Sequence, residues 1–444
     1  ELVNQLWEAG IPKSVLHFLP TDENEIGKHL ITHNDVDSIV LTGSYETALL
    51  FKKWNPSLRL LAETSGKNSI VVTASADIDA AVKDIIDSAF GHAGQKCSAS
   101  SLAIVEQSIY NNPTFFKQLK DAVTSLKVGD PADFSTSVGP LISPVNKNLS
   151  KVIEELEDGE EWLVEPKQLE SVYLWSPGVK INVQPGSWAH QNEWFGPVLG
   201  VMNAKDLEQA VDWQNSVPYG LTAGIQSLNE KECEYWIENV EAGNLYVNRT
   251  TTGAVVDRHP FGGWKKSSFG PTAKTGGNHY VSMFREYQPV ENIESLKYEF
   301  KLTWEEIGNK SIKLGDTESE RNFKRYVPYK NILLVTEEDF SKDLENFIFW
   351  ISELLNISIK IISQDTLLSP DSDLDISLFE KIRWIAMSQE IPTQIFNSGA
   401  TVDERGLSQN GKQELLCWLK EQSISITNHR YGNIGSGPQP FKDW

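Results

Sequence analysis

The sequence predicts an α/β fold in which parallel strands alternate with helices, followed by a smaller doubly wound α/β module near the C-terminus. Two observations favour this architecture. Short apolar segments typical of buried strands alternate with amphipathic helical segments through the first half of the chain. The same alternation resumes after a charged stretch near residue 300. With 444 residues, the chain can bury several cores, which excludes a miniprotein held together by disulfides or a metal.

The first half opens in helical periodicity from Leu2 to Ala9 and then alternates between strand and helix patterns. An amphipathic helix is expected from Asp77 to about Phe90, because its apolar residues recur at intervals of three and four. A polar helix is expected after Thr21. Strands are expected at Ser38–Thr42, Leu58–Glu63, Ser69–Thr73 and Leu102–Glu106.

The last third of the chain forms a separate pattern. From about Glu291 to Tyr326 the chain is charged and loses its apolar periodicity, so we expect a linker there. Beyond it the pattern predicts strand, helix, strand, helix, strand, helix and strand. These elements are expected at Ile332–Thr336, Leu344–Leu355, Ile357–Ser363, Leu378–Ser388, Thr393–Phe396, Gln413–Gln422 and Ser423–Thr427. No GxGxxG motif follows the first of these strands, so the sequence does not favour nucleotide binding by this module.

The overall charge argues against nucleic acid and anionic membranes as partners. Subtracting 61 acidic from 40 basic residues leaves a net charge of −21, which repels phosphates. Cys97, Cys233 and Cys417 are widely spaced and form no CxxC pair, so neither a disulfide framework nor a metal site is indicated. We therefore expect a reducing, cytoplasmic compartment. No apolar run reaches the roughly 18 residues of a membrane span.

Cys97 is the first candidate for chemistry. It follows two glycines and Lys96 in the segment from Gly91 to Ala99, whose small side chains leave the sulfur accessible. A cysteine is nucleophilic only as a thiolate, so accessibility next to a positive charge is the environment that activates it. The alternative is a small buried hydrophobic residue, which is what we expect for Cys233 and Cys417.

Glu63 is the second candidate, because it ends an apolar strand and precedes the turn Thr64–Asn68. A carboxylate that projects from a strand end into a crevice can activate a water molecule if partial burial raises its pKa. Taken alone, a solvated or ion-paired glutamate at the strand end is the simpler interpretation.

Read together, these segments resemble a known family. The segment Leu61–Asn68, followed 34 positions after Glu63 by Cys97, is similar to the aldehyde dehydrogenase superfamily, whose general base and nucleophile have this order and spacing. Two further motifs of that family appear in order. Asp37–Ser44 resembles the strand and helix start that meet the cofactor pyrophosphate, and Asn192–Pro197 resembles the ExFGP loop.

The resemblance implies roles for the two candidate residues. Cys97 would attack an aldehyde to give a tetrahedral oxyanion, to which the backbone N–H of Cys97 could donate a hydrogen bond. Hydride then leaves for a nicotinamide, and Glu63 would activate the water that releases the resulting thioester.

NAD is the cofactor that the resemblance implies, and NAD rather than NADP follows from the resemblance alone. Gly43 and Ser44 open a helix directly after a strand, where free N–H groups and the helix dipole favour an anion such as pyrophosphate. Glu193 would hold the nicotinamide ribose hydroxyls, and Phe195 would pack beside the nicotinamide. Thr64 stands where the family has leucine, and backbone groups of this turn could still reach the cofactor.

The substrate is implied by a narrower resemblance, to 1-pyrroline-5-carboxylate dehydrogenases, which oxidise L-glutamate γ-semialdehyde to L-glutamate. The similarity lies in three segments: Gln95–Ala99, Gly243–Arg249 and Thr252–Gly263. Such a substrate needs a site for its α-carboxylate. The Ser98 hydroxyl and the backbone N–H groups of Gly253 and Ala254 could bind that carboxylate. Phe261 would cover the aliphatic part of the substrate.

The chain also resembles the dehydrogenase portion of bifunctional proline-utilization proteins. Its stretch Leu419–Gly432 is similar to the non-catalytic aldehyde-dehydrogenase-like module at the end of longer members. We therefore expect an aldehyde dehydrogenase-like fold with an additional C-terminal doubly wound α/β module. The expected units are 1–60, the remainder of a Rossmann-type NAD-binding domain; 61–290, the catalytic domain; 291–326, a linker; and 327–444, the non-catalytic module.

The same resemblance implies that the chain is a piece of a longer polypeptide. The first part of the cofactor domain and the family's side-chain oxyanion donor would precede Glu1, so we expect the chain alone to bind cofactor poorly or not at all. An FAD-dependent proline dehydrogenase domain upstream, a homo-oligomer, and peripheral membrane attachment through the parent polypeptide are further expectations.

Three other interpretations stay open. Cys97 with His92 would suit a cysteine hydrolase, although no orienting Asn or Asp can be identified. A non-catalytic structural or assembly fragment is the second. The presence of Cys97 and Glu63 argues against it for the first domain, and their absence from the C-terminal module argues for it there. The third keeps the fold and changes the substrate to another semialdehyde.

Overall fold

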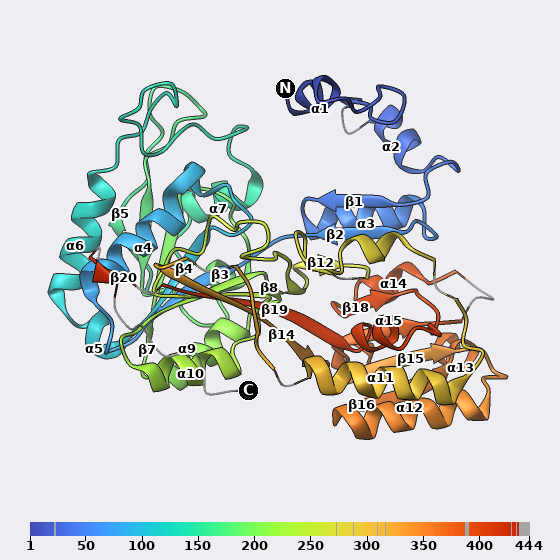
Figure 1. Cartoon of the computed structure of the whole chain (residues 1–444). Helices are drawn as coiled ribbons and strands as arrows, with labels where there is room; N and C mark the ends of the chain where they lie inside the picture. Colours follow the sequence, from blue (N-terminus) through green and yellow to red (C-terminus); the bar gives the residue numbers. More distant parts are fainter. Residues whose placement is uncertain are drawn as a thin grey trace.

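The computed structural model describes residues 1–21, 24–271, 273–286, 288–308, 310–315, 317–386, 390–427, 429–431 and 433–434. The described chain contains a ten-stranded central sheet, a three-stranded sheet near the N-terminus and a four-stranded sheet in the C-terminal part (Figure 1). Strands and helices alternate, so the predicted α/β class is confirmed.

The N-terminal segment forms the three-stranded sheet. Its elements are α1 (Leu2–Glu8), α2 (Glu25–Ile31), β1 (Ile39–Thr42), α3 (Tyr45–Trp54), β2 (Leu60–Glu63) and, from later in the chain, β12 (Ser268–Phe269). The order is β1-β2-β12, with β1 parallel and β12 antiparallel to β2. The β1–β2 register sets Thr42 beside Glu63, so the two strands end together at the edge from which α3 starts.

The central sheet has the order β13-β14-β19-β10-β9-β3-β4-β7-β6-β5. Its strands are β3 (Asn68–Val72), β4 (Ser100–Glu106), β5 (Glu161–Val164), β6 (Gly178–Ile181), β7 (Val198–Ala204), β9 (Thr222–Gln226), β10 (Asn244–Val247), β13 (Ile312–Lys313), β14 (Glu320–Pro328) and β19 (Leu419–Thr427). From β19 to β6 the strands are parallel, and antiparallel pairs complete both edges. β3, β9 and β10 are buried along their whole length, as expected for parallel strands covered on both faces.

Helices and short strands complete this part of the chain. They are α4 (Ile78–Phe90), η1 (Gly91–Gly94), α5 (Gln107–Tyr110), α6 (Pro113–Thr124), α7 (Lys147–Glu154), α8 (Trp188–Gln191), α9 (Leu207–Asn215), β8 (Tyr219–Gly220), α10 (Glu230–Asn239), β11 (Trp264–Lys265) and η2 (Val281–Phe284). The expected helix after Asp77 is confirmed as α4. The Asp77 side chain caps it by accepting hydrogen bonds from the backbone N–H groups of Asp79 and Ala80.

The C-terminal module is a four-stranded parallel sheet in the order β16-β15-β17-β18. Its elements are α11 (Ile293–Ile307), β15 (Asn331–Thr336), α12 (Lys342–Leu355), β16 (Ser358–Ser363), α13 (Gln364–Leu368), η3 (Ile376–Leu378), β17 (Lys381–Trp384), α14 (Thr393–Phe396), β18 (Thr401–Asp403) and α15 (Gly411–Leu416). The alternation of parallel strands and helices is as predicted, with two differences. The helix predicted at Gln413–Gln422 ends at Leu416, and the strand predicted at Ser423–Thr427 is part of β19, which belongs to the central sheet and not to the module.

Two elements of the module were assigned the wrong type from the sequence. The helix expected at Leu378–Ser388 is instead strand β17, and Ser388 itself lies outside the described residues. The strand expected at Thr393–Phe396 is the short helix α14. β17 is only four residues long, and around it Leu378, Ile382 and Ile385 recur at intervals of four and three, which is the pattern of a helix.

The segment expected to be a linker is also structured. It contains α11, whose buried residues Leu296, Phe300 and Ile307 form a narrow stripe, so the charged residues of the outer face dominate the sequence pattern. It then enters β14, which pairs antiparallel with β19 over nine residues. These two long strands run from the module into the central sheet (Figure 1). Asn428 and Gly432, in the expected C-terminal motif, lie outside the described residues.

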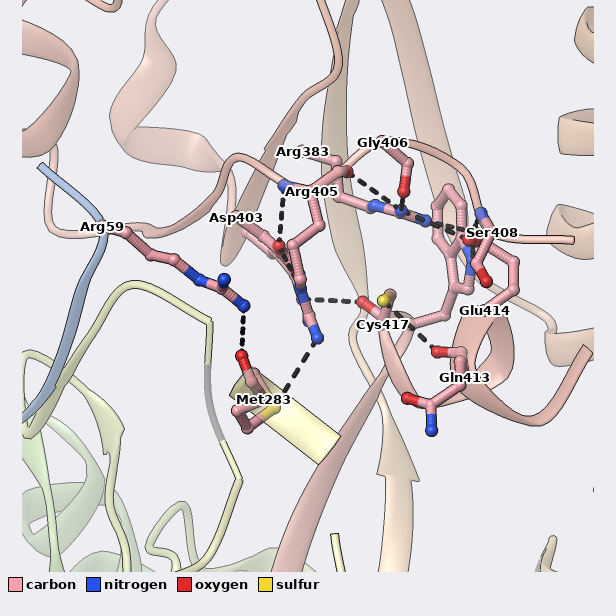
Figure 2. A network of polar contacts seen from close by, with 12 residues as sticks. Arg59, Met283, Arg383, Asp403, Arg405, Gly406, Ser408, Gln413, Glu414 and Cys417 are labelled. Carbon is pink, nitrogen blue, oxygen red and sulfur yellow. Dashed lines mark hydrogen bonds and ion pairs between the residues drawn. The ribbon is translucent and has the colours of Figure 1, made fainter. Parts of the chain in front are cut away.

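A buried polar network stabilises the module and reaches the rest of the chain (Figure 2). Arg383 of β17 and Glu414 of α15 form an ion pair in which both side chains are fully buried. Nearby, Arg405 lies with its Nη1 3.6 Å from the sulfur of Met283, and Arg59 donates to the Met283 carbonyl. The network therefore joins the C-terminal module to the strand-bearing N-terminal segment.

Candidate active site

Cys97 lies on a tight turn between η1 and β4. His92, Ala93 and Gly94 all have positive φ values, of 53°, 55° and 68°. A Cβ atom at Gly94 would lie 2.3 Å from the carbonyl oxygen of Gly196, so only glycine fits there. The turn thus packs directly against the ExFGP loop and leaves the Cys97 side chain half-buried, while His92 is exposed.

Glu63, at the end of β2, is brought into contact with Cys97. The Glu63 carboxylate lies within interaction range of the Cys97 thiol. Burial raises the pKa of Glu63, although its interactions with Cys97 and with the charge of Lys274 oppose the rise. Burial, together with the negative charge of Glu63, raises the pKa of Cys97 to about 12. At neutral pH the sulfur is therefore protonated, and Glu63, rather than His92, is the base that acts on its pKa.

Asn68, at the start of β3, holds the backbone of the Cys97 turn. Its Nδ2 donates to the carbonyl oxygens of Cys97 at 2.7 Å and Ala99 at 2.9 Å, and its Oδ1 accepts the N–H of Thr222 at 3.0 Å. The sequence predicts no role for Asn68. Its position in the turn that follows Glu63 was the available signal, since that turn faces the segment of Cys97.

Gly43 and Ser44 lie where β1 passes into α3, as expected. The Ser44 side chain caps α3 by accepting the N–H of Thr47 at 3.1 Å. The Gly43 N–H is not free, because it donates to the carbonyl oxygen of Glu63 at 3.2 Å. The group predicted to be free is therefore engaged, and it is the dipole at the N-terminus of α3 that would attract an anion here.

Thr64 is buried and engaged within the chain. Its N–H donates to the carbonyl oxygen of Ser267 at 3.1 Å, and its Oγ1 donates to that of Lys266 at 2.6 Å. These bonds fasten the turn after β2 to the short hairpin that contains β12. A contact between Thr64 and the cofactor stays a prediction.

Glu193 meets the turn after β2 from the ExFGP loop. Its Oε1 accepts the N–H of Gly66 at 3.0 Å, and burial raises the pKa of this carboxyl group against the lowering effect of hydrogen bonds from Gly66 and Ser65. Lys67 lies behind it with Nζ 3.5 Å from the centre of the Trp194 ring. Because Lys67 is fully buried, its charged form is disfavoured and the pKa of its ammonium falls.

Phe195 follows with φ of 55°, and its carbonyl oxygen accepts Nε2 of Gln95 at 3.3 Å. The aromatic ring is half-buried. Gln95 precedes Cys97 by two positions, so the loop that carries Glu193 and Phe195 is fixed to the turn that carries Cys97.

Ser98 and the loop of Gly253 and Ala254 are linked through a threonine. Thr251 donates from Oγ1 to the carbonyl oxygen of Ser98 at 2.9 Å. Ser98 is buried, whereas Gly253 and Ala254 are exposed, and Gly253 has φ of +88°. Thr251 is a residue that sequence analysis missed, although it lies between two of the segments compared there.

Phe261 lines a small cavity of about 60 Å³ together with Glu63 and Lys274. Lys274 was also missed. Its Nζ donates to the carbonyl oxygens of Gly243 at 2.8 Å and Gly262 at 2.6 Å, and burial lowers its pKa to about 7. The ammonium group thus supports the backbone beside Phe261 and faces the carboxylate of Glu63.

The described residues contain no cluster of three or more His, Cys, Asp or Glu side chains able to hold a metal ion. In the same part of the chain, none of the helices has the length and apolar character needed to cross a bilayer.

Comparison with curated proteins reveals relatives that match about two thirds of the chain. The 1-pyrroline-5-carboxylate dehydrogenase of Geobacillus sp. (strain WCH70) is 36% identical over 301 residues, which are 65% of this chain and 57% of that protein. The enzyme of the same name from Staphylococcus aureus (strain JH1) is 37% identical over 312 residues, or 66% of this chain and 58% of that protein. The chain therefore spans less than three fifths of the length of these relatives.

Solved structures extend the similarity into the C-terminal module. Proline utilization A (PutA) from Corynebacterium freiburgense has a TM-score of 0.87 and 40% identity, over 97% of this chain and 46% of that one. A 1-pyrroline-5-carboxylate dehydrogenase from Thermus with bound NAD has a TM-score of 0.57 and 36% identity, over 62% of this chain and 55% of that one. The model of the aldehyde dehydrogenase family matches residues 1–290. Since that match takes in the thiol, the carboxylate and both loops around them, this chain belongs to the aldehyde dehydrogenase family.

Proposed function

We propose that the protein containing these residues oxidises L-glutamate γ-semialdehyde to L-glutamate, the second step of proline catabolism, with NAD as the hydride acceptor. The observation that carries the proposal is the pairing of the Cys97 thiol with the carboxylate of Glu63. A thiol beside a buried carboxylate is suited to acyl transfer through a thioester, because one group attacks carbon and the other accepts a proton.

Cys97 acts as the nucleophile. Its thiol proton passes to Glu63 as sulfur bonds to the aldehyde carbon, so charge appears on the substrate oxygen rather than on sulfur. The Ser98 N–H donates to the sulfur and lowers the cost of the thiolate. Asn68 holds the peptide groups of the turn in place, so the Cys97 N–H is pre-positioned as one donor to the oxyanion.

Glu63 acts again in the release of product. After hydride has left carbon, Glu63 releases the thiol proton to solvent and is again a carboxylate. It then accepts a proton from the water molecule that attacks the thioester and passes that proton to the departing sulfur, so Cys97 leaves as the thiol and the product acid loses the second proton. Burial raises the pKa of Glu63, which makes the carboxylate a stronger base than an exposed glutamate. The overall balance is one aldehyde, one NAD⁺ and one water converted to one carboxylate, one NADH and two protons.

The residues present fit NAD in part. The start of α3 after Gly43 and Ser44 suits its pyrophosphate, and Glu193 retains acceptor capacity for ribose hydroxyls, since Gly66 and Ser65 use only part of its lone pairs. Phe195 would pack beside the nicotinamide. When bound, NAD supplies the hydride acceptor. We assign residues 1–60 to the remainder of the domain that holds it.

The α-carboxylate of the substrate would bind the Ser98 hydroxyl and the N–H groups of Gly253 and Ala254, with Phe261 over the methylene groups. The dehydrogenase names of the curated relatives support this choice of substrate. The similarity to PutA supports a parent polypeptide with an upstream FAD-dependent proline dehydrogenase domain. The proposal includes a cytoplasmic parent protein that forms homo-oligomers.

The test uses the full-length polypeptide and follows NADH formation from L-glutamate γ-semialdehyde. The wild type should turn over, Cys97→Ala should not, and Cys233→Ala should retain activity because that thiol is buried in α10. Activity of Cys97→Ala equal to the wild type would refute the mechanism. A wild type that oxidises other aldehydes but not this one would refute the substrate.

A further inference from the structure

The loop that carries Gly253 is exposed in the middle and buried near its ends. We call residues 249–259 the carboxylate loop. Its tip, residues 253–257, is exposed, whereas Thr251 and His259 are buried. An exposed tip gains little from packing, so the direction of its backbone N–H groups depends on how the two ends are held.

The first end is fastened to the catalytic turn. Thr251 donates through Oγ1 to the carbonyl oxygen of Ser98 at 2.9 Å, and its N–H donates to the Ser88 hydroxyl at 3.1 Å. The Ser100 and Thr251 hydroxyls lie 2.9 Å apart. This end therefore moves with Cys97 and its neighbours.

The second end, at His259, and Arg249 at the start of the loop both contact one carboxylate, that of Glu320. Arg249 donates from Nη1 to Glu320 Oε2, and His259 Nε2 lies 2.8 Å from Glu320 Oε1. The His259 Nδ1 accepts the N–H of Val255 at 3.0 Å, so the imidazole proton is on Nε2 and is donated to Glu320. A continuous chain of hydrogen bonds thus runs from Glu320 through His259 to Val255, the residue after Ala254.

Glu320 belongs to the C-terminal part of the chain. It begins β14, whose partner β19 lies beside β10, and Ile426 of β19 pairs with Val247 at the end of β10. Ser425 of β19 completes the contact, because its Oγ lies 2.5 Å from Arg249 Nη1. The strands that follow the catalytic segment thus supply the support for its carboxylate loop.

We propose that Glu320 is a positioning residue for the substrate, which holds His259 and Arg249 so that the N–H groups of Gly253 and Ala254 face the α-carboxylate of the aldehyde. The inference rests on the proposed function. It assigns to the C-terminal part a role in selecting one class of substrate, short aldehydes that carry a carboxylate at the far end. A bond to a charged acceptor is the stronger kind, so loss of the Glu320 charge loosens the loop without removing a group that touches the substrate.

The test compares two aldehydes in the full-length polypeptide. Glu320→Gln keeps the size of the side chain and one acceptor oxygen. We expect its KM for L-glutamate γ-semialdehyde to rise about tenfold, while its KM for propanal and both kcat values change less than about twofold. Glu318→Gln is the matched control, because Glu318 is exposed two positions earlier on the same turn, and it should leave all four values unchanged.

A binding measurement separates positioning from a general effect on folding. The affinity of Glu320→Gln for L-glutamate, measured by calorimetry, should fall by the same factor. Glu320→Asp keeps the charge and should recover part of the lost affinity. The inference is overturned if KM rises equally for both aldehydes, if only kcat falls, or if Glu320→Gln matches the control. If the wild type rejects L-glutamate γ-semialdehyde but accepts another carboxylated aldehyde, the proposed substrate fails. The KM values of the wild type and Glu320→Gln are then compared with that aldehyde, and the same rise of about tenfold is expected.

Discussion

The thiol of Cys97 lies within interaction range of the carboxylate of Glu63, so the proposed nucleophile and the proposed base form one unit. The negative charge of Glu63 opposes a second negative charge on sulfur, and burial acts in the same direction on the thiol. The pair therefore keeps its proton on sulfur until an aldehyde carbon is available to receive the electrons.

Replacing Glu63 should have opposite effects on thiol reactivity and on turnover. In Glu63→Gln the carboxylate no longer raises the pKa of Cys97, so that pKa falls from about 12 toward the ordinary thiol value of 9.0, and burial keeps it above that value. The pH midpoint of iodoacetamide labelling at Cys97 should fall accordingly. Hydrolysis of the thioester should slow by about 10²- to 10⁴-fold, measured as NADH formation in the full-length protein. A labelling midpoint that stays in place would contradict the electrostatic coupling, and Glu161→Gln, an exposed carboxylate on β5, serves as the control.

Asn68 should be needed both for stability and for the geometry of Cys97. Asn68→Ala leaves the buried carbonyl groups of Cys97 and Ala99 without their donor, which should lower the free energy of unfolding by about 2–3 kcal/mol. Urea unfolding measures the stability, and NADH formation should fall further than the loss of folded protein explains. Asn203→Ala, at an exposed position of β7, should change neither. An Asn68→Ala variant of normal stability and activity would show that the turn is held by other contacts.

Replacing only one partner of the buried ion pair Arg383–Glu414 should lower the free energy of unfolding more than replacing both. Arg383→Met leaves a buried carboxylate without its cation and should lower the free energy of unfolding by about 3–5 kcal/mol. The double variant Arg383→Met with Glu414→Gln should recover much of the loss, because Gln can still accept the Trp418 indole N–H. Urea unfolding compares these variants with Lys360→Met on the exposed face of β16. A double variant as unstable as the single one would mean that the arginine acts by packing and not by charge.

Acid should weaken the link between Glu320 and the carboxylate loop. Burial alone would raise the pKa of Glu320, but the His259 hydrogen bond and the charge of Arg249 outweigh burial and lower it from 4.5 to about 2. The stabilisation from a carboxyl group with a lowered pKa is complete above the unfolded value of 4.5 and is lost as pH falls toward 2. The difference in Tm between wild type and Glu320→Gln should therefore narrow between those two pH values. A difference that is constant with pH would argue that the charge of Glu320 does not contribute.

Patterns within short segments of the sequence predicted helices and strands and the two residues proposed for chemistry. The periodicity after Asp77 predicted α4, and the order of Glu63 and Cys97 predicted two residues that the fold brings into contact. The assignment of β17 failed because Leu378, Ile382 and Ile385 recur at helical intervals around a strand of only four residues, and α11 was missed because only three of its residues are buried.

Contacts between distant segments were not predictable from one sequence. Asn68 acts on a turn about thirty residues away, and Thr251 on Ser98 across more than 150 positions. Glu320 lies in a stretch that was expected to be a linker, since its role depends on the pairing of β14 with β19. Such long-range pairings leave no periodic signal in the segments that they join.

The pairing of β19 with β10 also has a consequence for biosynthesis. β10 ends at Val247, but the strand beside it ends at Thr427, so about 180 further residues must leave the ribosome before that edge of the catalytic sheet can close. The whole four-stranded module is made in between, and it can form its own core first. Until β19 arrives, β10 offers an open edge to other chains, and co-translational chaperones would be expected to bind nascent protein in this interval.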